Sequence, residues 1–470
     1  MLSARIQRNW RIIILTITIC IMSIPAYAQY SGGTGEPNNP YQIGTVDDLM
    51  NLGETPNNYN KNFILIAEID MSPNLPGRKV FEKAVIAANA GDTWGDFQEI
   101  PFTGVFDGNG HTISNLTIIG KNYLGLFGEV GSGAKILNTG VVNVSITSSG
   151  DCVGALVGKN FYGTLNGCYS SGTINGKKSS GGLVGLNSHG YIIRCHSTCT
   201  VIDSGELAYI GGLVGYNSYG TIAQCFSTGT IGNAFSSRRL VYAYVGGLVG
   251  FNSYGTVTQC YCTGAVRGNY ETGGLVGTDS FGKITNSYSI GEVTKTKNTE
   301  LSHVGGLIGT CLRSYVSQCY STSKVSGLYV EALVGQLNFG IVDACFWDIQ
   351  TSGQTASSTG GIGKTTDEMQ TKSTFTDAGW DLVGETENDT EGIWRICEDY
   401  PKLTWQMQAG DFVCPDGITL DDFDFFMDHW GDTDCNQNNG YCHGTDLNFS
   451  GIVDIDDYVI LQNLWLAQNP

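Results

Sequence analysis

The chain has 470 residues, enough for two or three domains with an ample apolar core. Its formal net charge of −19 at pH 7 argues against nucleic acid as a partner, because a polyanion would repel it. Only 15% of the residues are charged and 65 are glycine, which is typical of a turn-rich β protein. Residues 411–470 contain twelve Asp and no Glu, Lys or Arg, and such a one-sided block binds cations or stays disordered.

The N-terminus has the pattern of a secretory signal. Three arginines among the first eleven residues precede an apolar run over residues 12–24, and the Ala-Tyr-Ala of residues 26–28 suits cleavage after Ala28. The run is short for a transmembrane helix. Cys20 raises the alternative of a lipoprotein, but Ile19 stands where that signal needs a small residue. We therefore expect residues 1–28 to be removed, and a secreted or cell-surface protein without a membrane span in the mature chain.

Residues 29–124 are expected to form an N-terminal cap and the first coils of a repeat array. Residues 45–53 predict a short helix with Thr45 as its N-cap and Gly53 at its end. The apolar run at residues 63–69 predicts one buried strand. A helix ahead of an array of strands would cover the open edge of the end coil.

The sequence Asp-Gly-Asn-Gly at residues 107–110 predicts a turn between two strands. Asp107, Asn109 and His111 are close enough in sequence to suggest acid–base or metal chemistry, but Asx residues beside Gly are ordinary turn chemistry, which we favour. The phrase over residues 102–116 resembles the first coil of right-handed β-helix proteins, polysaccharide lyases among them. That resemblance bears on the fold far more than on activity.

One motif recurs through the middle of the chain, as in GGLVGYNSYGTIAQCFSTGTIG at residues 211–232. Its core leucine returns at intervals of 27, 30, 35, 27, 32 and 26 residues, followed at fixed distances by a Gly, a Cys and a ring residue. The leucines are Leu156, Leu183, Leu213, Leu248, Leu275, Leu307 and Leu333, and Leu126 suggests a degenerate eighth copy. Residues 125–346 are therefore predicted to be an array of units that bury their apolar faces on one another.

The residues of each repeat favour strands. They are rich in Val, Ile, Thr, Tyr and Cys, and the apolar runs are about four residues long between glycines, too short for helices. We expect an all-β fold, a parallel β-solenoid of about seven to eight coils with one coil per repeat. A β-propeller is the main alternative, but a blade usually needs about 40 residues.

Stacked coils give two columns of the repeat a physical meaning. Amide or acid side chains four residues after the leucines can hydrogen-bond from coil to coil as a ladder: Asn160, Asn187, Asn217, Asn252 and Asp279. Thiols stand twelve residues after the leucines: Cys168, Cys195, Cys225, Cys260, Cys319 and Cys345, with Ser287 in the remaining coil. Equivalent Cβ atoms of stacked strands lie about 4.8 Å apart, whereas a disulfide needs about 3.8 Å, so we expect buried free thiols.

These columns resemble the GLUG motif, which takes its name from the Gly-Leu-any-Gly core. The resemblance covers about residues 125–345 and implies a secreted or surface bacterial protein, since members of that family include adhesins and large peptidases. The motif itself is regarded as a structural repeat without a catalytic assignment.

Residues 347–410 are predicted to be a C-terminal cap or linker. Thr365 and Glu368 form a capping-box pattern that opens a short helix to about residue 372. Trp380, Trp394 and Trp405 follow. Clustered Trp can stack on sugar rings, but we favour a lid over the last coil.

The end of the acidic tail has the spacing of a calcium-binding loop. Oxygen-bearing side chains stand at loop positions 1, 3, 5, 9 and 12, a carbonyl at position 7 completes the ring, and Gly451 occupies the sharp turn at position 6. The predicted ligands are Asp446, Asn448, Ser450, Ile452, Asp454 and Asp457. Position 12 is Asp rather than the usual Glu. A solvated acidic turn without metal is the alternative.

This loop and the amphipathic helix predicted after it at residues 458–466 resemble a dockerin repeat, which normally occurs in two copies. The first copy would be residues 411–430. If Gly417 is aligned with Gly451, Phe412 and Cys414 fall at ligand positions, so the weaker candidates in this loop are Asp416, Asp421 and Asp422. The resemblance implies that residues 411–470 dock onto a cohesin-like module of another surface protein, and it is associated with polysaccharide-degrading assemblies.

Export permits disulfides outside the stacked column. Cys435 and Cys442 flank a loop of Asn and Gln and are the favoured pair, with Cys414 as the competing partner.

No catalytic motif is found in the sequence. None of the six His lies in the H-E-x-x-H pattern of zinc peptidases, and no G-x-S-x-G nucleophile motif occurs. We predict a protein that is not an enzyme: a solenoid for adhesion or for binding carbohydrate or a partner, anchored by a calcium-dependent module. Two alternatives remain open, a polysaccharide-degrading enzyme of the lyase or glycosidase kind with its site on the solenoid face, and a purely structural envelope protein.

Overall fold

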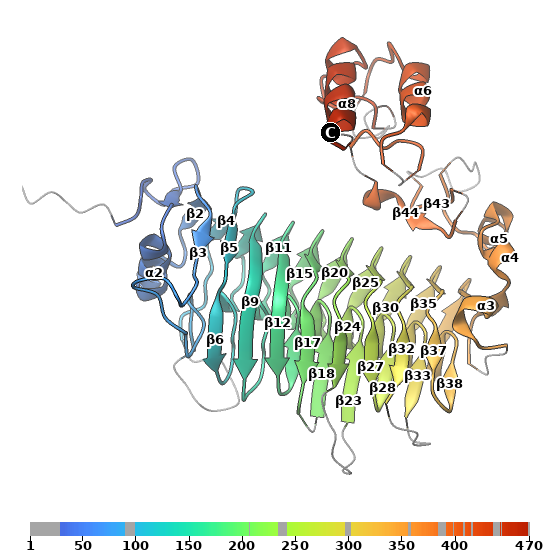
Figure 1. Ribbon diagram of the computed structural model, residues 1–470, viewed down its shortest axis with the longest axis horizontal. Coiled ribbons are helices and arrows are strands. Elements are labelled where there is room, and N and C mark those ends of the chain that lie inside the picture. Colours follow the sequence, from blue (N-terminus) through green and yellow to red (C-terminus); the bar gives the residue numbers. More distant parts are fainter. Residues whose placement is uncertain are drawn as a thin grey trace, which may run out of the picture.

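The computed structural model describes residues 29–89, 99–205, 207–233, 242–296, 302–355, 359–383, 392–397, 399–407, 409–414, 417–435, 442 and 444–468. The chain forms a rod of stacked parallel coils, with the N-terminal helix at one end and the C-terminal helices displaced to the side of the other end (Figure 1). The predicted signal segment, residues 1–28, lies outside the described residues. None of the helices in the described ranges is long and apolar enough to cross a membrane.

Three faces of the rod are regular parallel sheets. The first contains β1 (Tyr41–Ile43), β2 (Asn62–Leu65), β4 (Val105–Asp107), β8 (Lys135–Leu137), β11 (Thr164–Asn166), β15 (Tyr191–Ile193), β20 (Thr221–Ala223), β25 (Thr256–Thr258), β30 (Lys283–Thr285), β35 (Tyr315–Ser317) and β40 (Ile341–Asp343). The second contains β7 (Phe127–Val130), β10 (Val157–Phe161), β14 (Val184–Ser188), β19 (Val214–Ser218), β24 (Val249–Ser253), β29 (Val276–Ser280), β34 (Ile308–Leu312) and β39 (Val334–Asn338). The third contains β13 (Ser179–Gly181), β18 (Leu207–Gly211), β23 (Tyr242–Gly246), β28 (Glu271–Gly273), β33 (His303–Gly305) and β38 (Val330–Glu331).

The remaining face is a parallel sheet that divides along the rod. It begins with β3 (Ile69–Asp70), β5 (Thr112–Ser114), β6 (Thr117–Gly120) and the long strands β9 (Gly140–Ser148) and β12 (Tyr169–Gly176). Each later coil continues it with two short strands: β16 (His196–Ser197) and β17 (Thr200–Asp203), β21 (Phe226–Ser227) and β22 (Ile231–Asn233), β26 (Tyr261–Cys262) and β27 (Val266–Gly268), β31 (Tyr288–Ser289) and β32 (Val293–Lys295), β36 (Tyr320–Ser321) and β37 (Val325–Ser326). At the end of the rod, β41 (Phe346–Asp348) stacks on β36, and β42 (Ile362–Lys364) stacks on β41.

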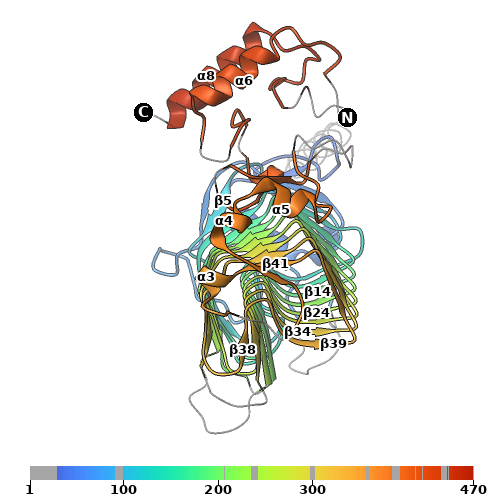
Figure 2. The ribbon, with the colours of Figure 1, turned by 90° about the vertical axis from the view of Figure 1, so that its right-hand side faces the viewer.

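The parallel β-solenoid predicted from the repeats is therefore confirmed. Equivalent residues pair in register from coil to coil, as Asn187 does with Asn217, and the degenerate copy at Leu126 supplies β7. Seen along the rod, the coils superpose (Figure 2). One apolar core runs through all of them, from Tyr30 to Trp347. A propeller is excluded, because successive repeats stack along an axis instead of radiating from it.

The N-terminal end is covered by helix α2 (Val46–Glu54), followed by the 3₁₀ turn η1 (Pro56–Asn58). Thr45 caps α2 with a complete capping box to Asp48, as predicted. Gly53 does not end the helix: a Cβ at this position would collide with the carbonyl oxygen of Val85, so glycine is needed there for close approach. The single strand predicted at residues 63–69 is two strands, β2 and β3, because the chain turns a corner between them and passes to another sheet.

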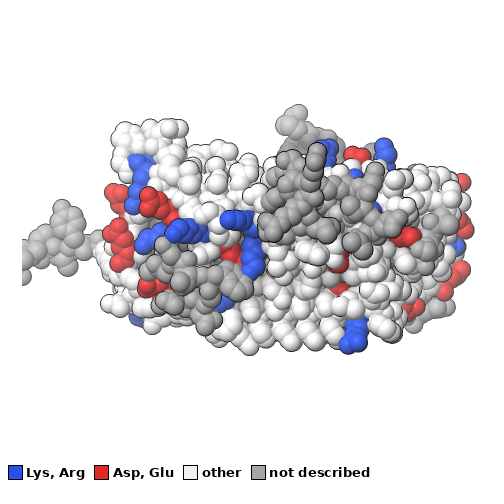
Figure 3. Space-filling model, turned by 90° about the horizontal axis from the view of Figure 1, so that it is seen from below, with Lys and Arg blue, Asp and Glu red and all other residues white. Residues whose placement is uncertain are grey.

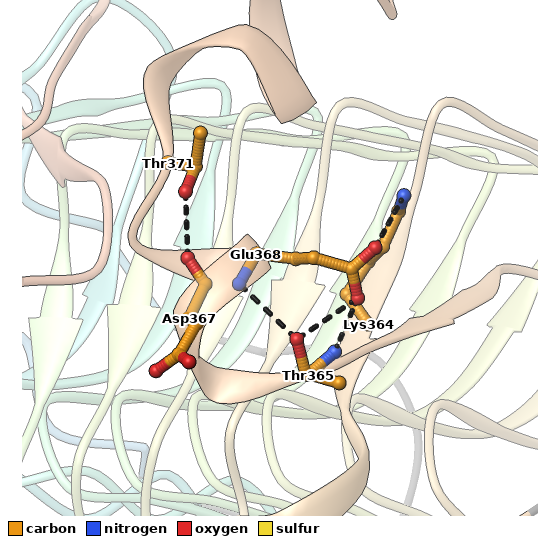
Figure 4. Close-up of polar contacts among 5 residues, drawn as sticks. All are labelled: Lys364, Thr365, Asp367, Glu368 and Thr371. Atoms are coloured by element: carbon orange, nitrogen blue, oxygen red, sulfur yellow. Dashed lines mark hydrogen bonds and ion pairs between the residues drawn. The ribbon is translucent and has the colours of Figure 1, made fainter.

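After the last coil the chain folds back over the side of the rod. It forms the helices α3 (Ile349–Ser352), α4 (Thr366–Met369) and α5 (Lys372–Thr376), the hairpin strands β43 (Trp394–Arg395) and β44 (Lys402–Leu403), and the 3₁₀ turn η2 (Thr404–Gln406). The predicted capping box is present: Thr365 and Glu368 exchange backbone and side-chain hydrogen bonds (Figure 4). The predicted single helix is interrupted after Met369, so α4 and α5 are separate.

We call residues 366–407 the lid. Its three tryptophans, Trp380, Trp394 and Trp405, pack along a column of rings on the divided sheet (Tyr261, Tyr288, Tyr320 and Phe346). Trp380 covers the side of the last coil, as predicted, whereas Trp394 and Trp405 extend the lid over earlier coils. Trp380 and Trp394 are fully buried. These side chains are therefore structural contacts of the lid, and neither buried ring has a face free for a sugar.

The acidic tail forms a small separate cluster that we call the C-terminal module (residues 411–468). Helices α6 (Leu420–Asp428) and α8 (Ile455–Gln468) pack around Phe412, Phe426 and Leu461. The predicted disulfide Cys435–Cys442 is present in this module. Cys414 pairs instead with Cys397, and this bond joins the module to the lid.

Candidate functional site

The predicted calcium loop lies between Thr445 and helix α8. Asp446 and Asp457 are buried at its two ends, and their carboxylates accept hydrogen bonds from backbone N–H groups of the loop. Asp446 accepts hydrogen bonds from the N–H groups of Ser450 and Gly451 (both 2.9 Å). Asp457 accepts from Asn448 and Asp454 (both 3.0 Å), so the two acids close one ring of chain.

The other predicted ligands follow the same ring. The Asn448 side-chain oxygen accepts the N–H of Ser450 at 2.8 Å, and the Ser450 hydroxyl donates to the carbonyl of Ile452 at 3.1 Å. The Asp454 carboxylate accepts the N–H of Asp456 at 2.9 Å. Gly451 has φ of +92°, which confirms a sharp turn where the spacing placed it. Within the described ranges, no group of three or more His, Cys, Asp or Glu side chains is placed to hold a metal, so any ion here would also need amide, hydroxyl and carbonyl oxygens.

The first loop is built in the same way, but not in the alignment expected from its glycine. Asp422 accepts the N–H groups of Val413 and Thr419 (both 2.8 Å), as Asp457 does those of Asn448 and Asp454. Asp411 accepts the N–H of Gly417 at 3.4 Å. The equivalent residues of the two loops are 35 positions apart, so the first loop runs from Asp411 to Asp422.

Asp411 is therefore the residue that sequence reasoning missed, because Gly417 is displaced by one position relative to Gly451. The equal eleven-residue separation of the two acid pairs, 411 to 422 and 446 to 457, was the available signal. Of the weaker candidates, Asp422 is buried in the loop, Asp421 is exposed on helix α6, and Asp416 lies outside the described residues.

The thiol column of the solenoid is buried and contains no disulfide. The N–H of Cys168 donates to the sulfur of Cys195, and that of Cys195 to the sulfur of Cys225, at 3.3 Å each. Ser287 takes the same role with its hydroxyl oxygen, which accepts from Cys260 at 3.1 Å. Burial raises the pKa of Cys168 and Cys225, so these thiols stay protonated. The column is structural.

The amide column also forms as predicted, and it explains the adjacent glycines. Each Asn side-chain amide donates to the next member of the column, as Asn187 does to Asn217 at 2.7 Å, and to a glycine carbonyl of its own coil. A Cβ at Gly220 would collide with the side chains of both Asn187 and Asn217. Glycine therefore stands here for close approach.

A row of rings runs beside the amide column, six residues after the core leucines, and all of its members are exposed except His189, which is half-buried. Its members stack face to face with centroids 4.6–4.9 Å apart and ring planes within 15° of parallel: Tyr162, His189, Tyr219, Tyr254 and Phe281. All five have φ between +52° and +58°, which is strained for such side chains, at an order of 1–3 kcal/mol each. We call this set the exposed ring row. Its signal in the sequence is the bulky residue that precedes each repeat glycine.

Charge on the rod is sparse. In Figure 3 most of the visible solenoid surface is uncharged, and Lys and Arg gather toward its N-terminal half. The turn at Asp107 is as predicted: its carboxylate accepts the N–H of Asn109 at 2.9 Å and the amide of Asn138 at 3.2 Å. The carboxylate of Asp107 therefore serves to stabilise the turn through these hydrogen bonds.

Comparison with known proteins agrees with the repeat. Residues 207–232 and 242–267 match the family model described as the GLUG motif. Halomucin of Haloquadratum walsbyi is 32% identical over 159 residues, which are 31% of this chain and 2% of halomucin. A protein of Evansella cellulosilytica, provisionally named a Gly-rich membrane protein, is 33% identical over 141 residues, 28% of this chain and 14% of that protein.

One solved structure aligns with a large share of this chain. It is the crystal structure of a Bacteroides ovatus protein provisionally named an immunoglobulin A1 protease, with a TM-score of 0.42 and 20% identity over 81% of this chain and 96% of that one. The chain spans only a small part of the relatives that it matches in sequence. The chain described here carries GLUG motif repeats, and these repeats fold as a parallel β-solenoid.

Proposed function

We propose that this protein is an exported, non-catalytic surface scaffold that docks through a calcium-dependent C-terminal module. The solenoid offers a long side for contact with a polysaccharide or a protein partner. The module attaches the rod to a cohesin-like or other surface protein.

The observation that carries the proposal is the ring of oxygen atoms in the second loop. Asp446 and Asp457 hold its two ends, Asn448 and Ser450 line it, and the turn at Gly451 brings the ends together. This is the donor set that a hard cation such as Ca²⁺ prefers. Bound calcium would replace part of the hydrogen bonding of the acids and lock the loop against helix α8.

The surface of the module supports docking. Leu420 and Ile455, which are equivalent in the two halves, open helices α6 and α8 and are 74% and 58% exposed. A pair of apolar side chains related in this way gives a partner two similar anchoring points. The exposed ring row supports the contact role of the rod, because a regular row of strained, exposed rings fits an extended polymer with repeating units better than a small molecule.

The calcium proposal is tested by calorimetric titration of the full chain with CaCl₂. We expect one binding event that Asp446→Ala abolishes, because this change removes a ligand from a buried position. Asp424→Ala is the matched control, since it removes the same charge from the exposed side of helix α6. Absence of binding heat, or an equal loss in both variants, would refute the calcium site.

The contact role is tested by co-sedimentation of the protein with insoluble neutral and acidic polysaccharides. We expect Tyr219→Ala combined with Tyr254→Ala to lower binding at least about tenfold, because these rings stack on their neighbours and offer a partner their edges and hydroxyl groups, each contributing on the order of 1 kcal/mol. Tyr242→Ala is the control, as this exposed ring lies on another sheet. Release of soluble sugar during the assay would instead favour the polysaccharide-degrading enzyme.

A further inference from the structure

The first loop of the C-terminal module keeps the two acids of the second loop but lacks the side-chain oxygens of Asn448 and Ser450. Asp411 is 4% exposed and Asp422 is fully buried. At the positions of Asn448 and Ser450, the first loop has Val413 and a proline, which offer no side-chain oxygen. A positive charge close to two buried carboxylates stabilises them, because it offsets the cost of their desolvation.

That charge comes from outside the module. Arg395 lies on strand β43 of the lid, and its guanidinium donates hydrogen bonds to the carbonyl of Val413 at 2.6 Å and to the carbonyl of Phe412. The carboxylate of Asp422 accepts hydrogen bonds from the backbone N–H groups of the same two residues, Phe412 at 2.5 Å and Val413 at 2.8 Å. The same stretch of chain is thus held by the acid through its N–H groups and by the arginine through its carbonyl oxygens.

Electrostatics agrees with this placement. Burial lowers the pKa of Arg395, and the negative charges of Asp411 and Asp422 act in the opposite direction. An arginine side chain stays charged in such a setting, since its ordinary pKa is far above neutrality. The disulfide between Cys397 and Cys414 fixes the strand of Arg395 to the loop close by.

We propose that Arg395 is the built-in counter-charge of the first loop, which therefore closes without a metal ion. The module then takes one calcium ion instead of two, and its first half is attached permanently to the lid while only the second half responds to calcium. The part about the second half rests on the proposed function; the part about Arg395 does not.

Hydrogen-exchange mass spectrometry of the full chain tests the role of Arg395. In EDTA, we expect Arg395→Met to speed exchange in residues 411–422 at least about tenfold, because the buried acids lose their partner and the loop opens. Arg395→Lys keeps the positive charge but loses the planar, forked set of N–H donors. The exchange rate of residues 411–422 in this variant should therefore lie between that of the wild type and that of Arg395→Met. Lys402→Met is the matched control. Lys402 lies on β44, the strand that pairs with β43, and its ammonium group forms an ion pair with Asp399 at the surface.

Unchanged exchange in Arg395→Met, or an equal effect of Lys402→Met, would overturn the proposal. If Arg395→Met also exchanges faster across the solenoid strands, the variant has lost structure in general, and Arg395→Lys becomes the deciding variant. Exchange in residues 411–422 that is as fast in Arg395→Lys as in Arg395→Met would then overturn the proposal. Calcium titration of the wild type should give one site, and two sites would contradict the metal-free first loop. If calcium does not bind at all, the proposed function fails while the exchange experiment in EDTA still decides the role of Arg395.

Discussion

At the scale of single residues, the most informative position is the end of the amide column. Each Asn passes one hydrogen bond to the next coil, and the last donor, Asn252, meets the carboxyl of Asp279 at 2.6 Å. Asp279 is fully buried, and burial raises its pKa to about 7. The ladder therefore ends on the one member whose charge changes near neutral pH.

The direction of the pH dependence follows from that shift. In the unfolded chain, an Asp ionises near about pH 3.9. Because the folded-state pKa is higher, the stabilising contribution of the protonated acid is complete below about pH 4 and is lost as the pH rises through about 7, by a total on the order of 4 kcal/mol.

We expect Asp279→Asn to remove this dependence by continuing the ladder with a neutral amide. The variant should unfold at higher urea than the wild type at pH 8 and at a similar concentration at pH 4. Asp343→Asn, at an exposed acid on strand β40, is the control. A variant that is no more stable than the wild type at pH 8 would show that the folded chain tolerates the ionised acid.

At the scale of elements, the lid is held by the buried column of rings on the divided sheet. The indole N–H of Trp394 donates to the side chain of Asn286 at 3.1 Å, and that of Trp405 donates to the carbonyl of Gln259 at 2.9 Å. Tyr320 donates in turn to the carbonyl of Pro401 at 2.7 Å. The lid is thus attached along several coils by ring packing together with directional hydrogen bonds.

We expect Trp394→Ala to detach the lid while leaving the coils folded. Removing a fully buried Trp costs on the order of 3–5 kcal/mol, and the amide of Asn286 loses its partner. Limited proteolysis should then cut within residues 366–407 before it cuts the solenoid. Trp430→Ala, at a ring that is 44% exposed in the C-terminal module, should leave the cleavage pattern unchanged; equal protection of both variants would show that Trp394 does not hold the lid.

At the scale of the whole molecule, the rod is a sum of similar layers. Each coil contacts mainly the coils on either side, so its stability comes from local layers and their interfaces. Helix α2 at one end and the chain around α3 at the other limit the exposure of strand edges. Length is therefore adjustable in steps of one repeat.

Deletion of residues 157–183, one complete repeat between two core leucines, should leave a folded rod. The new junction brings Leu156 before Val184, and the amide column then begins at Asn187. Far-UV circular dichroism should keep its β signature, and gel filtration should show a single species. Deletion of half that length should unfold or aggregate the chain, because it moves every column out of register; equal behaviour of the two deletions would contradict the layer model.

The C-terminal site shows where sequence reasoning stops. The second loop follows from local spacing, because Asp446 to Asp457 lie in one continuous stretch. The start of the first loop at Asp411 was missed, since the glycine used for alignment is displaced by one residue; the eleven-residue separation of Asp411 and Asp422 was the signal that marked it. Calcium binding at the second loop stays a prediction.

The β-solenoid, its layer order and its buried columns could be predicted from the residues alone, because a parallel stack places equivalent residues of successive repeats on top of one another. The segment that covers the rod, and the groups that meet from distant parts of the chain, became visible in the folded structure. No repeat in the sequence predicts the lid on the ring column, the bond between Cys397 and Cys414, or the contact of Arg395 with the carbonyl of Val413. They arise because a chain that has left the stack folds back onto whichever apolar and charged surfaces it can reach.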